Sequence, residues 1–225
     1  MKIKDYSILI VEDEFIASEY LYQILDSFGV ETIFKAKNSN EALEVVKNNH
    51  IDCIIDVRSS PYSAYSSQFN REYLNECLKR ESIRYIFMGD CLGARYENKN
   101  LLFSNGKVDF SKVRLTQEFI SGIKRVIDGL QKGFRIALMC SEKNPFDCHR
   151  FVLVSKGLQD KGIEMNHILP EKVVSNLELE DLLFEKYKIS KYDLFHTEKE
   201  NLELVYEKRN IDIAYNALTK EGDEE

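Results

Sequence analysis

Apolar residues along this chain alternate between short continuous runs and longer stretches with helical spacing. Short runs of β-branched and apolar residues are typical of buried strands, and they occupy residues 7–11, 32–35, 51–57, 84–88, 134–139 and 163–169. Apolar residues at helical spacing fill residues 15–28, 40–48, 70–80, 115–130 and 149–159. The pattern therefore predicts alternating strands and helices.

The residues that flank these stretches support the predicted boundaries. Asn70 stands where an asparagine side chain can cap a helix, and Gly29, Gly133 and Gly162 follow the ends of three others. Beyond Pro170 the composition becomes acidic and helical. Alternation of this kind is typical of α/β proteins. We predict a mostly parallel sheet with helices on both faces, Rossmann-like or flavodoxin-like, and a helical C-terminal extension.

The charge and the cysteine content of the chain indicate which binding partners and which cellular compartment to expect. The chain has 225 residues and a net charge of −7, and it has no basic stripe to attract nucleic acid or an anionic membrane in bulk. It also has no run of about 20 apolar residues, the length that a membrane-spanning helix needs. An odd number of cysteines, 5, without a framework spacing favours free thiols. We expect a cytoplasmic protein that binds no membrane.

The candidate chemistry is concentrated where the apolar run 134–139 ends. The loop that follows carries Cys140, Glu142, Cys148, His149 and Arg150, just before a predicted helix. In open α/β sheets, ligands bind outside the carboxyl ends of the strands, and a helix N-terminus there favours anions. We therefore expect a catalytic or binding site for a small-molecule or anionic ligand in this loop.

Three interpretations of the loop stay open. Cys140 or Cys148 is a nucleophile, because a helix N-terminus and the neighbouring His149 and Arg150 favour a thiolate; Cys148 is then expected to react faster than Cys53 and Cys77. Alternatively, Cys140, Cys148 and His149, with or without Glu142, bind a transition metal, although the Cys-x7-Cys-His spacing lacks the short knuckle of structural zinc sites. In the third interpretation the cysteines are buried packing residues and Asp147 caps the helix.

A charged pair follows the apolar run 51–55. Asp56 and Arg58 lie at the carboxyl end of a predicted central strand. Arg58 would bind an anionic ligand through its two-pronged guanidinium while Asp56 orients it. The alternative, which has the same weight, is that Asp56 and Arg58 form a buried ion pair with a structural role. This chain loosely resembles rhodanese-like sulfurtransferases in two short patterns. Those enzymes also have Asp-x-Arg after a strand and a cysteine in a later strand-to-helix loop.

Residues from about 31 to 215 resemble a bacterial family called domain of unknown function 488. The resemblance rests on residues 56–61, 68–70, 85–90 with 92–93, and 140–150, which occur in the same order. It implies an α/β fold and a site built from those motifs, without an assigned reaction. The chain departs from the family at Lys37-Asn38-Ser39, where such proteins commonly have Gly-His-Ser.

A second resemblance, to the receiver domain of two-component response regulators, covers about residues 6–56. It rests on residues 8–14 and 36–43. It implies that Glu12 and Asp13 hold Mg²⁺ beside Asp56 as phosphoacceptor, with a histidine kinase as partner if the segment is active. The receiver's later hydroxyl and lysine residues are missing from this chain, and Pro61 comes five residues after Asp56 rather than four.

These observations lead to one main functional hypothesis and two alternatives. We expect an α/β protein in which a receiver-like segment, 1–56, continues into a family-like portion, 57–220, as one domain. Its leading function is that of an enzyme for a small molecule or anion, with a Cys/His/Arg site. The alternatives are a phosphorelay module with a degenerate receiver and a non-catalytic binding domain.

Overall fold

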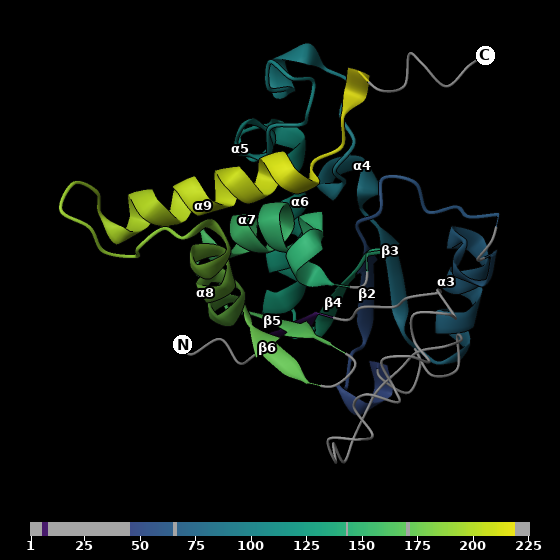
Figure 1. Ribbon diagram of the computed structural model, residues 1–225. Coiled ribbons are helices and arrows are strands. Elements are labelled where there is room, and N and C mark those ends of the chain that lie inside the picture. Colours follow the sequence, from purple (N-terminus) through teal and green to yellow (C-terminus); the bar gives the residue numbers. More distant parts are fainter. Residues whose placement is uncertain (1–5, 9–45, 65–66, 143, 170–171, 219–225) are drawn as a thin grey trace, which may run out of the picture.

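The computed structural model describes residues 6–8, 46–64, 67–142, 144–169 and 172–218 (Figure 1). Its elements run in the order β1 (Tyr6–Ile8), β2 (Cys53–Asp56), η1 (Ser67–Phe69), α3 (Arg71–Arg80), β3 (Arg84–Phe87), α4 (Gly89–Leu92), η2 (Lys99–Leu101), α5 (Phe110–Val113), α6 (Gln117–Gln131), β4 (Ile136–Met139), η3 (Pro145–Asp147), η4 (Arg150–Ser155), α7 (Lys156–Gln159), β5 (Met165–Ile168), β6 (Val173–Ser175), α8 (Asn176–Tyr187) and α9 (Glu198–Ile213).

The strands form two small sheets within the described ranges. Strands β3, β2 and β4 pair in parallel, with Asp56 opposite both Phe87 and Met139. Strand β5 pairs in parallel with β1 and antiparallel with β6. Because Asp56, Phe87 and Met139 are the last residues of their strands, the three following loops leave the sheet at the same edge.

Helices cover both faces of the β3-β2-β4 sheet. On one face, Ile54 and Met139 belong to a cluster with Leu74 and Leu78 of α3. On the other face, alternate strand residues, Cys53, Ile55, Ile136 and Leu138, pack in a larger cluster with residues of α6, η4 and α9. Figure 1 shows α3 and α6 on opposite sides of these strands. The predicted α/β architecture is confirmed.

Most predicted boundaries in the described ranges agree with the structure. The helix predicted at 70–80 is α3, with Asn70 as its N-cap residue, although the Asn70 side chain makes no capping hydrogen bond. Gly133 and Gly162 have φ angles of 88° and 79°, which glycine adopts without steric cost after a helix. The helix predicted at 149–159 begins instead as a π-helix, η4, and continues as α7.

The C-terminal region is helical, as predicted, apart from one strand. Helices α8 and α9 each begin with a capping box, formed by Ser175 with Glu178 and by Thr197 with Glu200. Strand β6 was not predicted, because three residues are too few for an alternating pattern to stand out. None of the helices in the described ranges combines the length and apolar character that crossing a bilayer requires.

Several N-terminal predictions lie outside the described residues. They include the helix at 15–28, the strand at 32–35, and all but the last residues of the helix at 40–48. Of the strand predicted at 7–11, only its start lies in a described range, within β1. All five cysteines are described, and all are free thiols, as the odd number indicated.

Candidate functional site

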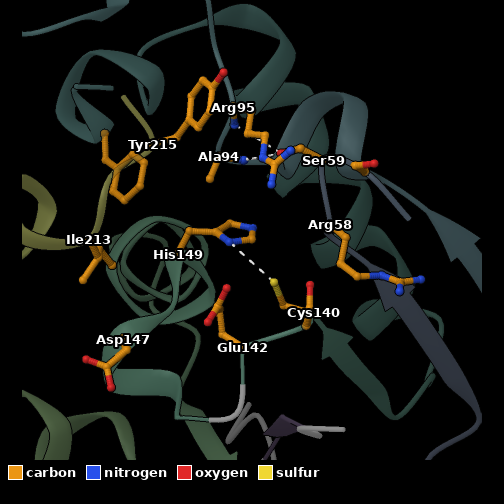
Figure 2. A pocket seen from close by; sticks show the side chains of 13 residues that line it. Arg58, Ser59, Ala94, Arg95, Cys140, Glu142, Asp147, His149, Ile213 and Tyr215 are labelled. Atoms are coloured by element: carbon orange, nitrogen blue, oxygen red, sulfur yellow. Dashed lines mark hydrogen bonds between the residues drawn. The ribbon is translucent and has the colours of Figure 1, made fainter. Parts of the chain in front are cut away.

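The loops after β2, β3 and β4 surround a pocket of about 250 Å³ at the carboxyl edge of the sheet. The C-terminal end of α9 and the residues after it close one side (Figure 2). The lining residues are Arg58, Ser59, Ser60, Ala94, Arg95, Phe110, Cys140, Ser141, Glu142, Asp147, His149, Ile213 and Tyr215. The pocket thus lies where open α/β sheets bind ligands.

Two glycines let the loops after β2 and β3 touch. A Cβ on Gly89 would lie 1.9 Å from the carbonyl oxygen of Arg58, and one on Gly93 would lie 2.5 Å from Ser59 Oγ. The hydroxyl oxygen of Ser59 accepts hydrogen bonds from the backbone N–H groups of Ala94, at 2.8 Å, and Arg95, at 3.1 Å. These contacts hold Arg95 on the pocket wall.

Asp56 and Arg58 form a buried ion pair. Arg58 donates from Nη2 to Asp56 Oδ2 at 2.6 Å and from Nε to Oδ1 at 2.9 Å, and Nη2 also reaches the Phe69 carbonyl oxygen at 2.9 Å. Tyr85 donates its hydroxyl to Asp56 Oδ2 at 2.6 Å, and burial together with this carboxylate raises the pKa of Tyr85. Figure 2 shows the Arg58 guanidinium turned away from Cys140. The structure thus contains the ion pair that the structural interpretation of Asp56 and Arg58 predicted. Ligand binding by this pair stays a prediction.

Cys140 lies directly after β4, and its sulfur faces the imidazole of His149. The distance from Cys140 Sγ to His149 Nδ1 is 3.7 Å, and His149 Nε2 lies 3.1 Å from the carbonyl oxygen of Val57. A carbonyl oxygen only accepts, so Nε2 carries the ring hydrogen. In the neutral ring Nδ1 is then unprotonated and faces the thiol as an acceptor.

Cys148 is buried close to Cys140 and does not line the pocket. Its exposed fraction is 0%, and its Sγ is 3.9 Å from His149 Nδ1. It accepts hydrogen bonds from Arg150, from the backbone N at 3.4 Å and from Nε at 3.2 Å. Arg150 Nη2 in turn donates to the carbonyl oxygen of Glu142 at 2.5 Å. The π-helix η4 starts at Arg150, and π-turns are frequent at functional sites.

The pKa values of the two thiols are shifted in opposite directions. A hydrogen bond from Cys148, with the nearby His149 and Arg150 charges, holds the pKa of Cys140 well below its usual range. Burial and the hydrogen bond to Cys140 raise the pKa of Cys148 well above it. Burial and the Cys140 charge also raise the pKa of Glu142, which keeps a proton more readily than a solvated carboxyl does. From the sequence, either loop cysteine was a candidate nucleophile, and Cys148 was expected to react faster than Cys53 and Cys77. Of the two loop cysteines, this geometry favours Cys140.

The predicted metal ligands come together as well. Cys140 Sγ, Cys148 Sγ and one ring nitrogen of His149 lie within 4.8 Å of one another. Two sulfurs and an imidazole nitrogen could supply three of the four ligands of a tetrahedral transition-metal site. Glu142 is not part of this group. The other metal prediction, Mg²⁺ at Glu12 and Asp13, lies outside the described residues.

Several pocket residues were not predicted from the sequence. Arg95 belongs to this set, although it lies only two residues after the Leu92-Gly93 pattern, which was a usable signal. Ser59 lies within the motif at 56–61 but was not singled out. Tyr215 has no such signal, because it reaches the pocket from beyond α9. Asp147, expected as a helix cap in one interpretation, forms an ion pair with Arg209 instead.

Comparison with known proteins identifies a family for the segment that holds this site. Residues 38–156 match the family described as "Domain of unknown function DUF488". The matched segment includes Asp56, Arg58 and the whole loop from Cys140 to Arg150. The comparison gives no support to the receiver resemblance of residues 6–56. No curated protein and no solved structure matches the chain significantly.

Proposed function

The chain belongs to the DUF488 family, and we propose that it is a thiol-dependent enzyme in which Cys140 attacks a small anionic molecule. One observation carries the proposal. Cys140 lines the pocket, and its Sγ lies 3.7 Å from a His149 nitrogen whose tautomer is set by the Val57 carbonyl. A nucleophile beside a base, with the base oriented by a third group, is the arrangement of nucleophilic catalysis.

Each proton in the proposed reaction has a place. His149 Nδ1 takes the thiol proton as the Cys140 sulfur bonds to the electrophilic atom of the substrate. The electron pair of the broken bond leaves with the departing group, which takes a proton from the His149 imidazolium or from Glu142. Glu142 suits the role of acid because its raised pKa keeps it protonated to a higher pH.

The charge on the pocket wall supports an anionic substrate. Arg58 is bound to Asp56, whereas Arg95 forms no ion pair with the residues that the structure describes. Its guanidinium lies 5.5 Å from the centre of the Tyr215 ring, on the opposite side of His149 from Glu142 in Figure 2. A pocket of about 250 Å³ accommodates a small molecule rather than a polymer chain.

Competitive alkylation of the five cysteines tests this proposal. Trypsin releases each cysteine in its own peptide: 48–58, 72–79, 85–95, 136–143 and 144–150. At neutral pH, limited iodoacetamide should label peptide 136–143 first, well ahead of the partly exposed Cys77 and Cys91. Labelling of Cys140 only after unfolding, in protein pretreated with a chelator, would refute the proposal.

The chelator arm separates a metal-dependent reaction from the thiol mechanism. A metal ion on Cys140, Cys148 and His149 would protect both cysteines until the chelator is added. Equal Cys140 labelling with and without chelator supports a free thiol. Labelling that appears only after chelation would replace this proposal with a metal centre.

The phosphorelay alternative has weaker support. Both Asp56 carboxylate oxygens accept hydrogen bonds from Arg58, and one also accepts from Tyr85, so an attacking oxygen is not free. Glu12 and Asp13 lie outside the described residues. A small phosphodonor with Mg²⁺ should leave the intact mass unchanged; a stable phosphoryl adduct absent from Asp56→Asn would revive the alternative.

A further inference from the structure

One buried nucleophilic group has no part in the proposed reaction. Cys148 has an exposed fraction of 0%, so a substrate in the pocket cannot reach its sulfur directly. Cys140 lines the pocket and Cys148 does not, and their sulfurs lie within 4.8 Å of each other. Cys140 is therefore the group through which Cys148 can act on a molecule in the pocket.

Burial raises the pKa of the Cys148 thiol, so its deprotonation needs hydrogen-bond donors and a base close to the sulfur. Two N–H groups of Arg150 point at its Sγ, at 3.4 and 3.2 Å, and hydrogen bonds from a cationic donor stabilise a thiolate. His149 Nδ1 lies 3.9 Å from the same sulfur and 3.7 Å from that of Cys140. One ring nitrogen can thus take a proton from either thiol.

The two sulfurs are also close enough to bond after a side-chain movement. They lie within 4.8 Å of each other, and a disulfide needs about 2.05 Å. Rotation of the two side chains about their Cα–Cβ bonds moves the sulfurs by distances of this size. No other thiol of the described chain belongs to this cluster.

We infer that Cys140 and Cys148 form a redox pair in which Cys140 reduces a small hydroperoxide and Cys148 resolves the oxidised sulfur as an intramolecular disulfide. This inference rests on the nucleophilic Cys140 of the proposed function, and not on the charge of its substrate, and it adds a substrate class and a second cysteine. The oxidant is the hydroperoxide, and the two thiols supply both electrons.

The steps balance. The Cys140 thiolate attacks the distal peroxide oxygen, an S–O bond forms, the O–O bond breaks, and the leaving alkoxide takes the proton held by His149. Cys148 then gives its proton to His149 Nδ1 and attacks the Cys140 sulfur. The S–S bond forms, the S–O bond breaks, and hydroxide leaves as water with that proton. Two molecules of an external thiol restore both cysteines by disulfide exchange: the first forms a mixed disulfide, and the second displaces it and leaves as the external disulfide.

Peptide mapping of peroxide-treated, chelator-treated protein tests the inference. With stoichiometric hydrogen peroxide, the wild-type chain should lose two hydrogen atoms, and non-reduced trypsin digestion should join peptides 136–143 and 144–150. This disulfide should form at least about tenfold faster than any other cysteine oxidises. Cys77→Ser is the matched control and should behave as the wild type does.

Substitution of the second cysteine should change the product and leave the first step intact. In Cys148→Ser, peptide 136–143 should accumulate a sulfenic acid that dimedone traps. In Cys140→Ser, peptide 144–150 should stay reduced. If Cys148→Ser does not fold, as judged by its thermal melt, the wild-type peptide map decides alone.

The possible failures are distinguishable. A lasting Cys140 sulfenic acid in the wild type, without a disulfide, would overturn the pairing and leave Cys140 as the nucleophile. Cys140 that reacts with iodoacetamide but not with peroxide would overturn the hydroperoxide assignment only. Cys140 that reacts with neither reagent in native protein would overturn both the pairing and the proposed function.

Discussion

His149 Nε2 lies 3.1 Å from the carbonyl oxygen of Val57, a residue 92 positions away in the chain. Val57 follows β2 and His149 precedes η4, so the contact joins the loops of two adjacent parallel strands. It fixes which imidazole nitrogen faces the thiols. The reactivity of Cys140 therefore depends on the register of the sheet as well as on its own neighbours.

Replacing His149 should slow the Cys140 thiol without unfolding the chain. In His149→Gln the base is lost, and the alkylation rate of Cys140 at neutral pH should fall about 100-fold. The measurement is the rate of labelling of peptide 136–143. His196→Gln, at an exposed histidine paired with Asp193, is the control and should react normally. An unchanged rate in a folded His149→Gln protein would remove His149 from the reaction.

Removing the Arg95 charge should change the preference for anionic reagents. Iodoacetate and iodoacetamide alkylate by the same displacement, but only iodoacetate carries a charge. Arg95→Ala should lower the iodoacetate-to-iodoacetamide rate ratio at Cys140 about threefold, the size expected for one exposed charge. Arg80→Ala, which removes a distant exposed guanidinium on α3, should leave the ratio unchanged. Equal ratios in both variants would argue against anion recognition by Arg95.

Gly89→Ala should destabilise the fold because the loops after β2 and β3 approach too closely for a side chain. The added Cβ would lie 1.9 Å from the Arg58 carbonyl oxygen, a backbone atom that cannot rotate away. We expect a loss of about 2 kcal/mol or more in the free energy of unfolding by urea.

Gly129→Ala is the matched control for that substitution. Its Cβ would meet only the flexible end of the Ile136 side chain, at 2.9 Å, and it lies within α6. The alanine should cost far less, because its better helix propensity offsets the contact. Equal destabilisation by the two substitutions would contradict the close loop contact.

Stability should fall in mild acid through His167. Burial lowers the pKa of this histidine from 6.5 to about 4, while its Nε2 lies 3.0 Å from Asn176 Oδ1. Between those pKa values the unfolded chain binds a proton that the folded chain excludes, so stability is full above pH 6.5 and is lost as the pH falls toward 4. The loss between pH 7 and pH 5 should be about 2 kcal/mol.

Urea unfolding of wild type and His167→Gln at both pH values isolates this contribution. Glutamine cannot gain a proton, so the variant should lose about 2 kcal/mol less than the wild type does over the same pH interval. Identical losses in the two proteins would assign the acid sensitivity to other groups.

The sequence by itself determined strands β2 to β5 and the longer helices α3 and α6 in their order, and the place of the site. Both follow from local patterns. Apolar runs such as 51–57 and 134–139 predict buried strands wherever they pack, and the glycine after α6 ends that helix through its own backbone freedom. The polar residues that follow β2 and β4 were therefore expected to meet at one sheet edge, and the pocket lies there.

Only the tertiary structure decided which of those residues face the pocket and what each one touches. Cys140 and Cys148 have equal claims in the sequence, but their exposed fractions of 6% and 0% separate them. Arg58 was expected to bind either a ligand or Asp56, and in the structure it forms an ion pair with Asp56. Arg95, which was not predicted, lines the pocket. These outcomes depend on strand register and on contacts between loops far apart in the chain, and local periodicity carries no information about either.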